Sequence, residues 1–251
     1  MLEVREVTRR FGGVAAVDGV SMAVNRGDIV GLIGPNGAGK TTLFNCIAGT
    51  VRPTGGRILL DGKPIEREPA HRRLDRGLCR TFQIPRPFPQ MTLVENLLVA
   101  AKGQSGERLL PNWLRPGAIG REERANIERA MALLEFVTLD KLAYEPARVL
   151  SGGQRKLLEL ARAMMAEPTL VLLDEPAAGV NPSLCETIMS RIVELNQRGI
   201  AFLIIEHNMD LIARLCRHVF VMAGGQLLVE GEPAAVVRHP QVIEAYLGGA
   251  A

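Results

Sequence analysis

An eight-residue segment near the N-terminus has the composition of a phosphate-binding loop. The segment from Gly34 to Thr41 reads GPNGAGKT and matches the pattern G-x-x-x-x-G-K-[ST]. Its glycines let successive backbone N–H groups turn toward one phosphate, and a helix expected from Lys40 onward adds the positive end of its dipole. The Lys40 ammonium can reach the β- and γ-phosphates, and the Thr41 hydroxyl can ligate Mg²⁺. The residues predicted to bind nucleotide here are Gly34, Pro35, Asn36, Gly37, Ala38, Gly39, Lys40, Thr41 and Thr42.

Two adjacent acids, Asp174 and Glu175, follow the apolar run 170–173. A carboxylate at the carboxyl end of a buried parallel strand lies at the mouth of the sheet, beside a phosphate loop. We therefore expect Asp174 to hold Mg²⁺ and Glu175 to polarise a water aimed at the γ-phosphate. On their own these acids would be ordinary turn residues after a strand. The chain has no Asn-Lys-x-Asp segment for guanine and no recognisable kinase acceptor site, so adenine nucleotide is favoured.

Strands and helices alternate around these residues. A continuous apolar run bounded by turn residues, such as 29–33, is typical of a strand buried on both faces. Residues 92–150 differ, because helical stretches at 93–101 and 121–136 flank a loop-like stretch at 103–120. The other predicted strands are 2–7, 17–24, 170–173, 200–205, 219–222 and 226–229, and the other predicted helices are 40–48, 154–165, 183–197, 209–215 and two in 233–247. The pattern predicts an α/β fold with a parallel sheet and an all-helical insert.

Composition and charge narrow the class of protein. The 251 residues carry 30 basic and 27 acidic side chains, and a net charge of +3 does not favour a nucleic-acid partner. No uncharged apolar run approaches the roughly 18 to 20 residues that span a bilayer, and the first residues do not resemble a signal peptide, so we expect a cytoplasmic protein. The four cysteines and four histidines show neither disulfide nor metal-ligand spacing.

The segment 150–154 reads LSGGQ. With the phosphate loop and the strand acid at this spacing, the whole chain resembles the ATP-binding cassette of an ABC transporter. In that family LSGGQ binds the γ-phosphate of ATP held by the other protomer, so that two cassettes close around two nucleotides. A hydroxyl, two glycines and a helix N-terminus suit an anion, whereas a simple helix cap needs only the serine. The resemblance therefore assigns nucleotide binding also to Ser151, Gly152, Gly153 and Gln154.

Other family elements are matched residue by residue. Gln83, in RTFQ, matches the glutamine that touches Mg²⁺ or the attacking water, and His207 matches the switch histidine that contacts the γ-phosphate. Phe11 matches the aromatic that stacks on adenine, although a core phenylalanine at a strand end is the competing interpretation. Asn181 stands where the family often has Asp, but an amide can still hydrogen-bond. Together the two arguments assign catalysis to Lys40, Gln83, Glu175 and His207, and Mg²⁺ coordination to Thr41, Gln83 and Asp174.

The resemblance also implies a domain organisation. It describes residues 1–251 as one cassette: a P-loop NTPase core with a parallel sheet and an N-terminal antiparallel β subdomain at 1–91 and 151–232. A helical subdomain at 92–150 ends in LSGGQ, and C-terminal helices follow at 233–251.

Within the family, the chain looks like the larger cassette subunit of the branched-chain amino acid importers. The residues that carry this likeness are RTFQ at 80–83, MTLVEN at 91–96, the long loop before Arg121, the segment 174–182 and the ending EAYLG at 244–248. One departure is Gly152, where that branch often has an aromatic residue.

This likeness implies ATP hydrolysis with Mg²⁺ at the cytoplasmic face of the membrane. The implied partners are permease subunits, a second identical or sister cassette, and a solute-binding protein acting through the permease. An export cassette, such as the lipopolysaccharide-extraction type, is the alternative. A non-transport ABC ATPase is disfavoured by the single phosphate loop and the modest insert, and a purely regulatory module is disfavoured by the intact Glu175.

Overall fold

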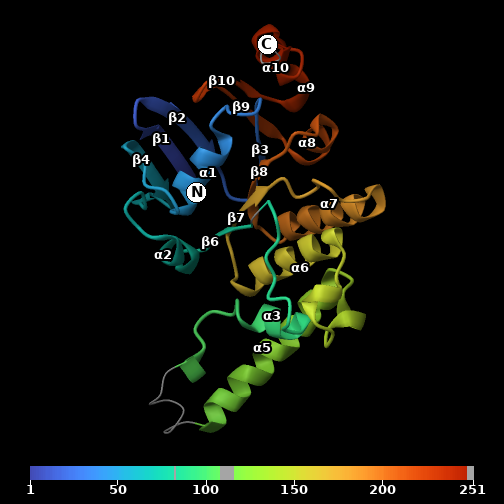
Figure 1. The fold of residues 1–251 in the computed structure, drawn as a ribbon. Helices are drawn as coiled ribbons and strands as arrows, with labels where there is room; N and C mark the ends of the chain where they lie inside the picture. Colours follow the sequence, from blue (N-terminus) through green and yellow to red (C-terminus); the bar gives the residue numbers. More distant parts are fainter. Residues whose placement is uncertain (82, 108–115, 248–251) are drawn as a thin grey trace. The chain divides into compact units, whose positions relative to one another are not determined.

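A computed structural model describes residues 1–81, 83–107 and 116–247 of the chain (Figure 1). Part of the loop expected at 103–120 therefore lies outside the described residues, as does Gly248 of the EAYLG ending. The chain divides into two compact units. Unit 1 comprises Met1–Gln83, Pro168–Pro176 and Ile192–Ala251, and unit 2 comprises Ile84–Glu167 and Ala177–Arg191.

A six-stranded sheet forms the centre of unit 1. Its strand order is β10-β9-β3-β8-β7-β6, and neighbouring strands run parallel except for the β9–β10 hairpin. Every residue of β3, β7 and β8 is buried, because helices and the second sheet cover both faces. The strands are β3 (Ile29–Ile33), β6 (Leu78–Arg80), β7 (Leu170–Asp174), β8 (Ala201–Ile205), β9 (His218–Ala223) and β10 (Gln226–Gly231).

An antiparallel sheet of order β2-β1-β4-β5 completes the β structure of unit 1. Its strands are β1 (Leu2–Phe11), β2 (Val14–Val24), β4 (Gly55–Leu60) and β5 (Lys63–Pro64). Helix α1 (Lys40–Ala48) packs in the same core as both sheets, where Leu43, Phe44 and Ile47 are fully buried. The two strands predicted first are longer than expected, and β4, β5 and β6 were missed because they are short and rich in Gly, Arg and Pro.

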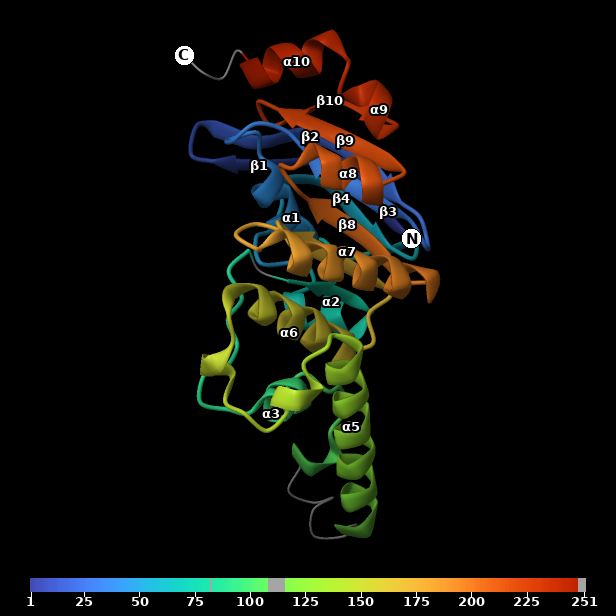
Figure 2. The same ribbon diagram turned by 90° about the vertical axis from the view of Figure 1, so that its right-hand side faces the viewer.

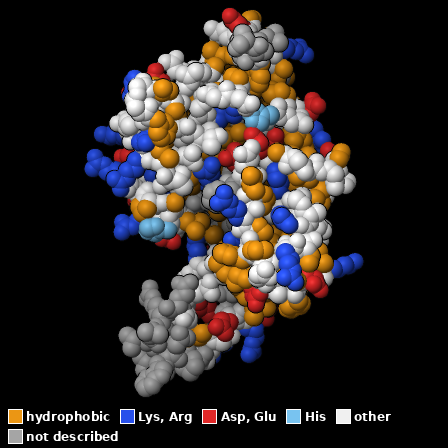
Figure 3. Space-filling view, in the orientation of Figure 1, with side chains coloured by type: hydrophobic (Ala, Val, Ile, Leu, Met, Phe, Trp, Pro, Cys, Tyr) orange, Lys and Arg blue, Asp and Glu red, His pale blue; other side chains and the backbone are white. Residues whose placement is uncertain are grey.

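Short helices surround the sheets of unit 1. They are α2 (Ala70–Asp75), α8 (Met209–Leu215), α9 (Pro233–Val236) and α10 (Pro240–Leu247), and α2 was not predicted. Figure 2 shows α9 and α10 beside strand β10. Hydrophobic side chains gather over these two C-terminal helices in Figure 3, and the exposed apolar residues there are Val237, Ile243 and Tyr246.

The residue Arg73 of α2 ties that helix to the helix of the phosphate loop. Its side chain is fully buried, and its Nη1 donates to the carbonyl oxygens of Cys46 and Ile47 at 2.6 Å each. A cation at the C-terminus of α1 complements the negative end of the helix dipole. Helix α1 is thereby fixed at the end opposite to the phosphate loop.

Unit 2 is helical. It contains α3 (Leu93–Leu98), α5 (Pro116–Phe136), α6 (Gly152–Met165) and the first part of α7 (Pro182–Gln197). The prediction that the loop extends to residue 120 was wrong, because helix α5 already begins at Pro116. Proline is tolerated in the first turn of a helix. Helix α3 ends three residues earlier than predicted. Within the described part of the chain, no helix combines the length and apolar character that crossing a membrane requires.

Candidate nucleotide-binding site

The phosphate loop connects β3 to α1, and glycine is required at two of its positions by close backbone approach. Gly34 has φ 146°, and a Cβ atom there would lie 2.1 Å from the Met222 carbonyl oxygen. Gly39, with φ 97°, would place a Cβ 2.2 Å from the Ala16 carbonyl oxygen. No L side chain fits these contacts, so the loop can lie against β9 and β2 only with glycine at both positions.

Lys40 is buried at the first turn of α1. Its Nζ donates to the carbonyl oxygens of Gly34 at 2.7 Å and Pro35 at 2.9 Å. Burial lowers the pKa of the Lys40 ammonium from its ordinary value, while the nearby charges of Glu175 and Asp174 raise it. An ammonium has three N–H donors, so a donor is left for a phosphate after the two carbonyls are satisfied.

A cavity of about 320 Å³ opens beside the loop. It brings together the phosphate-loop residues 36–42 with Gln83, Glu175 and His207, which come from three other places in unit 1. Ala16 and Ile205 complete the described lining. The sequence therefore identified nearly all the residues that surround the cavity, although they are up to 171 positions apart from Asn36 to His207.

Glu175 lies between Gln83 and His207. Its Oε2 accepts a hydrogen bond from Gln83 Nε2 at 2.7 Å, and its Oε1 is 2.7 Å from His207 Nε2. The backbone of Glu175 has φ 49°, the left-handed region that costs free energy in a residue other than glycine. Its N–H donates to the Ile205 carbonyl oxygen of β8 at 2.9 Å, which holds this conformation in place. The three side chains predicted for catalysis beside Lys40 thus form one hydrogen-bonded group.

Asp174 ends strand β7 next to this group, and its side chain is 7% exposed. Its Oδ2 lies 3.1 Å from Nη2 of Arg80, and Arg80 also donates from Nη1 to Asn45 Oδ1. No role was predicted for Arg80 or Asn45, because only the packing of β6 beside β7 and α1 brings them to Asp174.

The aromatic predicted to stack on adenine, Phe11, lies at the end of β1 and is 48% exposed. This exposure contradicts the competing interpretation of a core phenylalanine. The guanidinium of Arg9 lies 4.4 Å from the centroid of the Phe11 ring, so the aromatic carries a cation on one face. Phe11 is not among the described residues that line the 320 Å³ cavity.

Tyr246 lies in helix α10, within the EAYLG ending. Burial raises the pKa of its phenol, and a hydrogen bond with the Gly34 backbone acts in the opposite direction.

The LSGGQ segment belongs to unit 2 and begins helix α6. The Gln154 N–H donates to Ser151 Oγ at 3.3 Å, and the Ser151 N–H donates to Gln154 Oε1 at 3.0 Å, which makes a capping box. Gly152 is exposed, and a Cβ there would meet nothing within 4 Å. Gly153 is buried, and a Cβ there would lie 2.2 Å from Leu184 Cδ2 of α7. The second glycine thus has a packing role that the sequence did not reveal.

The side chain of Asn181 caps the N-terminus of helix α7. Its Oδ1 accepts hydrogen bonds from the Leu184 N–H at 2.9 Å and from the Ser183 hydroxyl at 3.0 Å. An aspartate would make the same cap, which explains why the amide is tolerated at this position.

The residues present fit a nucleotide with Mg²⁺. The glycine cradle leaves room for an anion, and the oxygens of Thr41, Gln83 and Asp174 are the hard donors that Mg²⁺ prefers. The described residues contain no cluster of three or more His, Cys, Asp or Glu side chains suited to a metal.

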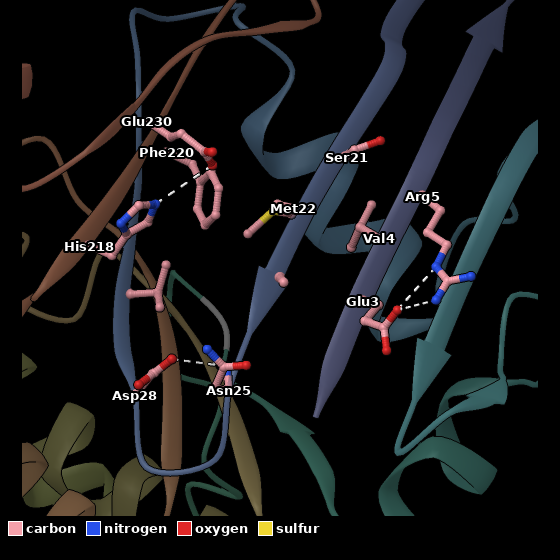
Figure 4. Close-up of a pocket in the computed structure, with 12 residues that line it drawn as sticks. Glu3, Val4, Arg5, Ser21, Met22, Asn25, Asp28, His218, Phe220 and Glu230 are labelled. Atoms are coloured by element: carbon pink, nitrogen blue, oxygen red, sulfur yellow. Dashed lines mark hydrogen bonds and ion pairs between the residues drawn. The ribbon is translucent and has the colours of Figure 1, made fainter.

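A second hollow of unit 1, of about 550 Å³, holds none of the predicted site residues (Figure 4). Its charged side chains already face one another. Glu3 accepts from Arg5 Nε at 3.0 Å, and Glu230 lies 3.6 Å from His218 Nε2. The cavity at the phosphate loop collects the predicted site residues and is the candidate site, and it defines a P-loop nucleoside triphosphatase.

Comparison of the sequence with known protein families and relatives identifies the family. A family described as "ABC transporter" matches residues 17–178, and one described as "Branched-chain amino acid ATP-binding cassette transporter" matches residues 226–251. The chain is 43% identical over 251 residues to the "High-affinity branched-chain amino acid transport ATP-binding protein BraF" of Pseudomonas aeruginosa, covering 100% of this chain and 98% of that protein. It is 42% identical to the "Probable branched-chain amino acid transport ATP-binding protein LivG" of Archaeoglobus fulgidus, covering 99% and 95%.

Solved structures agree with this relationship. An ATP-binding cassette of an ABC transporter in its ADP conformation superposes with a TM-score of 0.86 at 40% identity, covering 99% of this chain and 98% of that one. A nucleotide-free cassette gives a TM-score of 0.85 at 39% identity, covering 98% of both. The chain belongs to the ABC transporter family, and it is an ATPase of the ATP-binding cassette type. The fold class and the enzyme class predicted from the sequence are confirmed.

Proposed function

We propose that the chain hydrolyses ATP to drive uptake of branched-chain or related amino acids through separate membrane permease subunits. The proposed ATP hydrolysis is supported most directly by the Gln83–Glu175–His207 group beside the phosphate loop. The proposed uptake of amino acids is supported by the full-length relatives named for branched-chain amino acid transport and by the C-terminal family match at 226–251.

In this proposal each side chain has a defined task. Lys40 and the loop N–H groups hold the β- and γ-phosphates, and Glu175 accepts the proton of the attacking water. Gln83 and His207 fix the Glu175 carboxylate, because each donates to a different oxygen of it. Each carboxylate oxygen has a second lone pair, so a water can still donate a hydrogen bond to Glu175 while both donors stay in place. Most of the rate enhancement comes from positioning and charge stabilisation.

Thr41, Asp174 and Gln83 would hold Mg²⁺. When bound, the ion supplies neutralisation of phosphate charge and a fixed orientation of the phosphates. Asp174 is suited to this task by its place at the end of β7.

The proposed assembly places two cassettes head to tail, with LSGGQ of one facing the ATP of the other. The exposed Gly152 at the first turn of α6 supports this role, because no described atom lies within 4 Å of its Cβ position and a helix N-terminus suits an anion. The second cassette is a copy of this chain or a sister subunit. The pair is attached to the cytoplasmic face of the membrane by the permease, which a solute-binding protein supplies with substrate.

Reconstitution tests this function. The chain is purified from membranes with the permease subunits that retain it, inserted into liposomes, and assayed for ATP turnover with the matching solute-binding protein. We expect leucine, isoleucine or valine to stimulate turnover and to accumulate in the liposomes, whereas glutamate serves as the control amino acid. Stimulation by a lipid-linked saccharide in place of an amino acid would establish the export alternative and overturn the proposal.

A further inference from the structure

Arg80 occupies a position where three elements of unit 1 meet. It is the last residue of β6, which pairs in parallel with β7, and its side chain is 11% exposed. One guanidinium nitrogen, Nη2, lies 3.1 Å from Asp174 Oδ2 at the end of β7. The other, Nη1, donates to Asn45 Oδ1 of α1. The guanidinium therefore bridges a carboxylate on a strand and an amide on a helix.

The position of Asn45 on helix α1 connects this bridge to Thr41. Asn45 is four residues after Thr41, so the two side chains lie on the same face of α1. The bridge thus fixes the strand that carries Asp174 relative to the helix that carries Thr41. Arg80 also lies over the fully buried ring of Phe44, 6.0 Å from its centroid, which limits the movement of the guanidinium.

We propose that Arg80 is a positioning residue for Mg²⁺, which holds Asp174 and, through Asn45, the Thr41 face of α1 at the separation the ion requires. This inference rests on the proposed function, in which Thr41 and Asp174 hold Mg²⁺. A planar, bidentate group suits the task, because two fixed N–H directions set two partners at once. A lysine has the charge but not this fork, so Arg80→Lys separates geometry from charge.

The test measures ADP affinity as a function of Mg²⁺ concentration, using a fluorescent ADP analogue and the full chain. We expect Arg80→Met to raise the Mg²⁺ concentration for half-maximal binding by about tenfold, the lower end of the effect of residues that orient metal ligands. The ADP affinity in EDTA should stay at the wild-type value. Arg80→Lys should show an intermediate shift. A merely structural role would instead lower the ADP affinity in EDTA and leave the Mg²⁺ midpoint unchanged, and that result would overturn the inference.

Three further variants make the result unambiguous. Asn45→Ala should shift the Mg²⁺ midpoint in the same direction, with no further shift in the Arg80→Met/Asn45→Ala double variant. Asn45→Ala and Arg80→Lys carry the test if Arg80→Met does not fold. The matched control is Arg76→Met, since Arg76 pairs with Glu68 at the surface of unit 1.

Asp174→Asn distinguishes this inference from the proposed function. If Asp174→Asn leaves the Mg²⁺ dependence intact, the proposed metal site itself is wrong. If Asp174→Asn abolishes the dependence while Arg80→Met leaves the midpoint unchanged or lowers it, only the role of Arg80 is wrong.

Discussion

Lys40 illustrates how the site works at the scale of single residues. Its ammonium is buried and donates to two carbonyl oxygens of its own loop, so the loop conformation and the charge are fixed together. Burial without a phosphate is unfavourable for the charged form, as the lowered pKa of Lys40 indicates. A bound phosphate therefore gains an ammonium that is already oriented.

We expect Lys40→Ala to weaken ATP binding by roughly 2 kcal/mol, about 30-fold in Kd, which is the size of a lost hydrogen bond to a charged group. Isothermal titration calorimetry measures this change. Lys63→Ala, which removes an exposed ammonium from β5, is the control. A Lys40→Ala variant with wild-type affinity would contradict the phosphate-binding role.

Two cysteines provide a prediction on pH. Burial raises the pKa of the Cys46 thiol to about 11 and that of Cys216 to about 12, against an ordinary value of 9.0. Above pH 9 the unfolded chain loses these protons while the folded chain keeps them, so the free energy of unfolding should fall as pH rises toward 11. Below pH 9 the ionisation of these two thiols should not change the free energy of unfolding.

Thiol labelling checks the same assignment. Iodoacetamide at pH 8 should leave Cys46 and Cys216 unmodified in the native protein and modify them after unfolding, as read by peptide mass spectrometry. The partly buried Cys79 and Cys185 are the internal comparison. Rapid native labelling of Cys46 would show that its burial is wrong.

At the scale of elements, the LSGGQ segment serves two purposes at once. Ser151 and Gln154 cap α6 through reciprocal hydrogen bonds, while Gly153 lets α6 approach Leu184 of α7 within unit 2. The simple explanation as a helix cap is therefore correct for two residues and incomplete for the glycines. Only the neighbouring helix shows why the two glycines differ.

We expect Gly153→Ala to lower the free energy of unfolding by about 1–3 kcal/mol, because the added methyl group overlaps Leu184. Gly152→Ala should leave the free energy of unfolding within about 0.5 kcal/mol of the wild-type value, since nothing lies near its Cβ position. Chemical denaturation compares the two, and Leu184→Ala should reduce the penalty of Gly153→Ala. Equal effects of both glycine substitutions would contradict the packing role.

The elements themselves were predicted where hydrophobic pattern and end signals agree. The bounds of β3, α1 and α8 match the prediction, because a buried apolar run and the flanking glycine or asparagine determine their ends. Strand β6 and helix α2 were missed, since three and six residues carry too little pattern. Their existence depends on β7 and α1, against which they pack.

At the scale of the whole molecule, the chain contains two compact units, and the cavity at the phosphate loop is lined by residues of unit 1. The LSGGQ residues, 150–154, are part of unit 2. The proposed function pairs them with the nucleotide of a second cassette, so hydrolysis should depend on the concentration of cassettes.

Glu175→Gln tests this dependence. The variant keeps the side-chain size but cannot accept a proton, so steady-state ATP hydrolysis should fall at least about 100-fold. ATP affinity should remain, and light scattering after size exclusion should show a dimer with ATP and a monomer without it. Glu230→Gln, at an acid outside the phosphate cavity, is the control. Undiminished hydrolysis by Glu175→Gln would exclude Glu175 as the base.

The sequence by itself determined the family, the phosphate loop, the paired acids and the buried strands, because these depend on local patterns with fixed spacing. The tertiary structure decided which residues support them. Arg80 reaches Asp174, and Arg73 fixes the end of α1, each across a long stretch of chain. Such contacts arise only when strands pair and helices pack, since no local pattern records which side chain will lie beside another in the folded protein. The buried hydrophobic side chains of strands β1, β2, β3, β7 and β8 and of helix α1 accordingly share one core, which forms only in the folded chain.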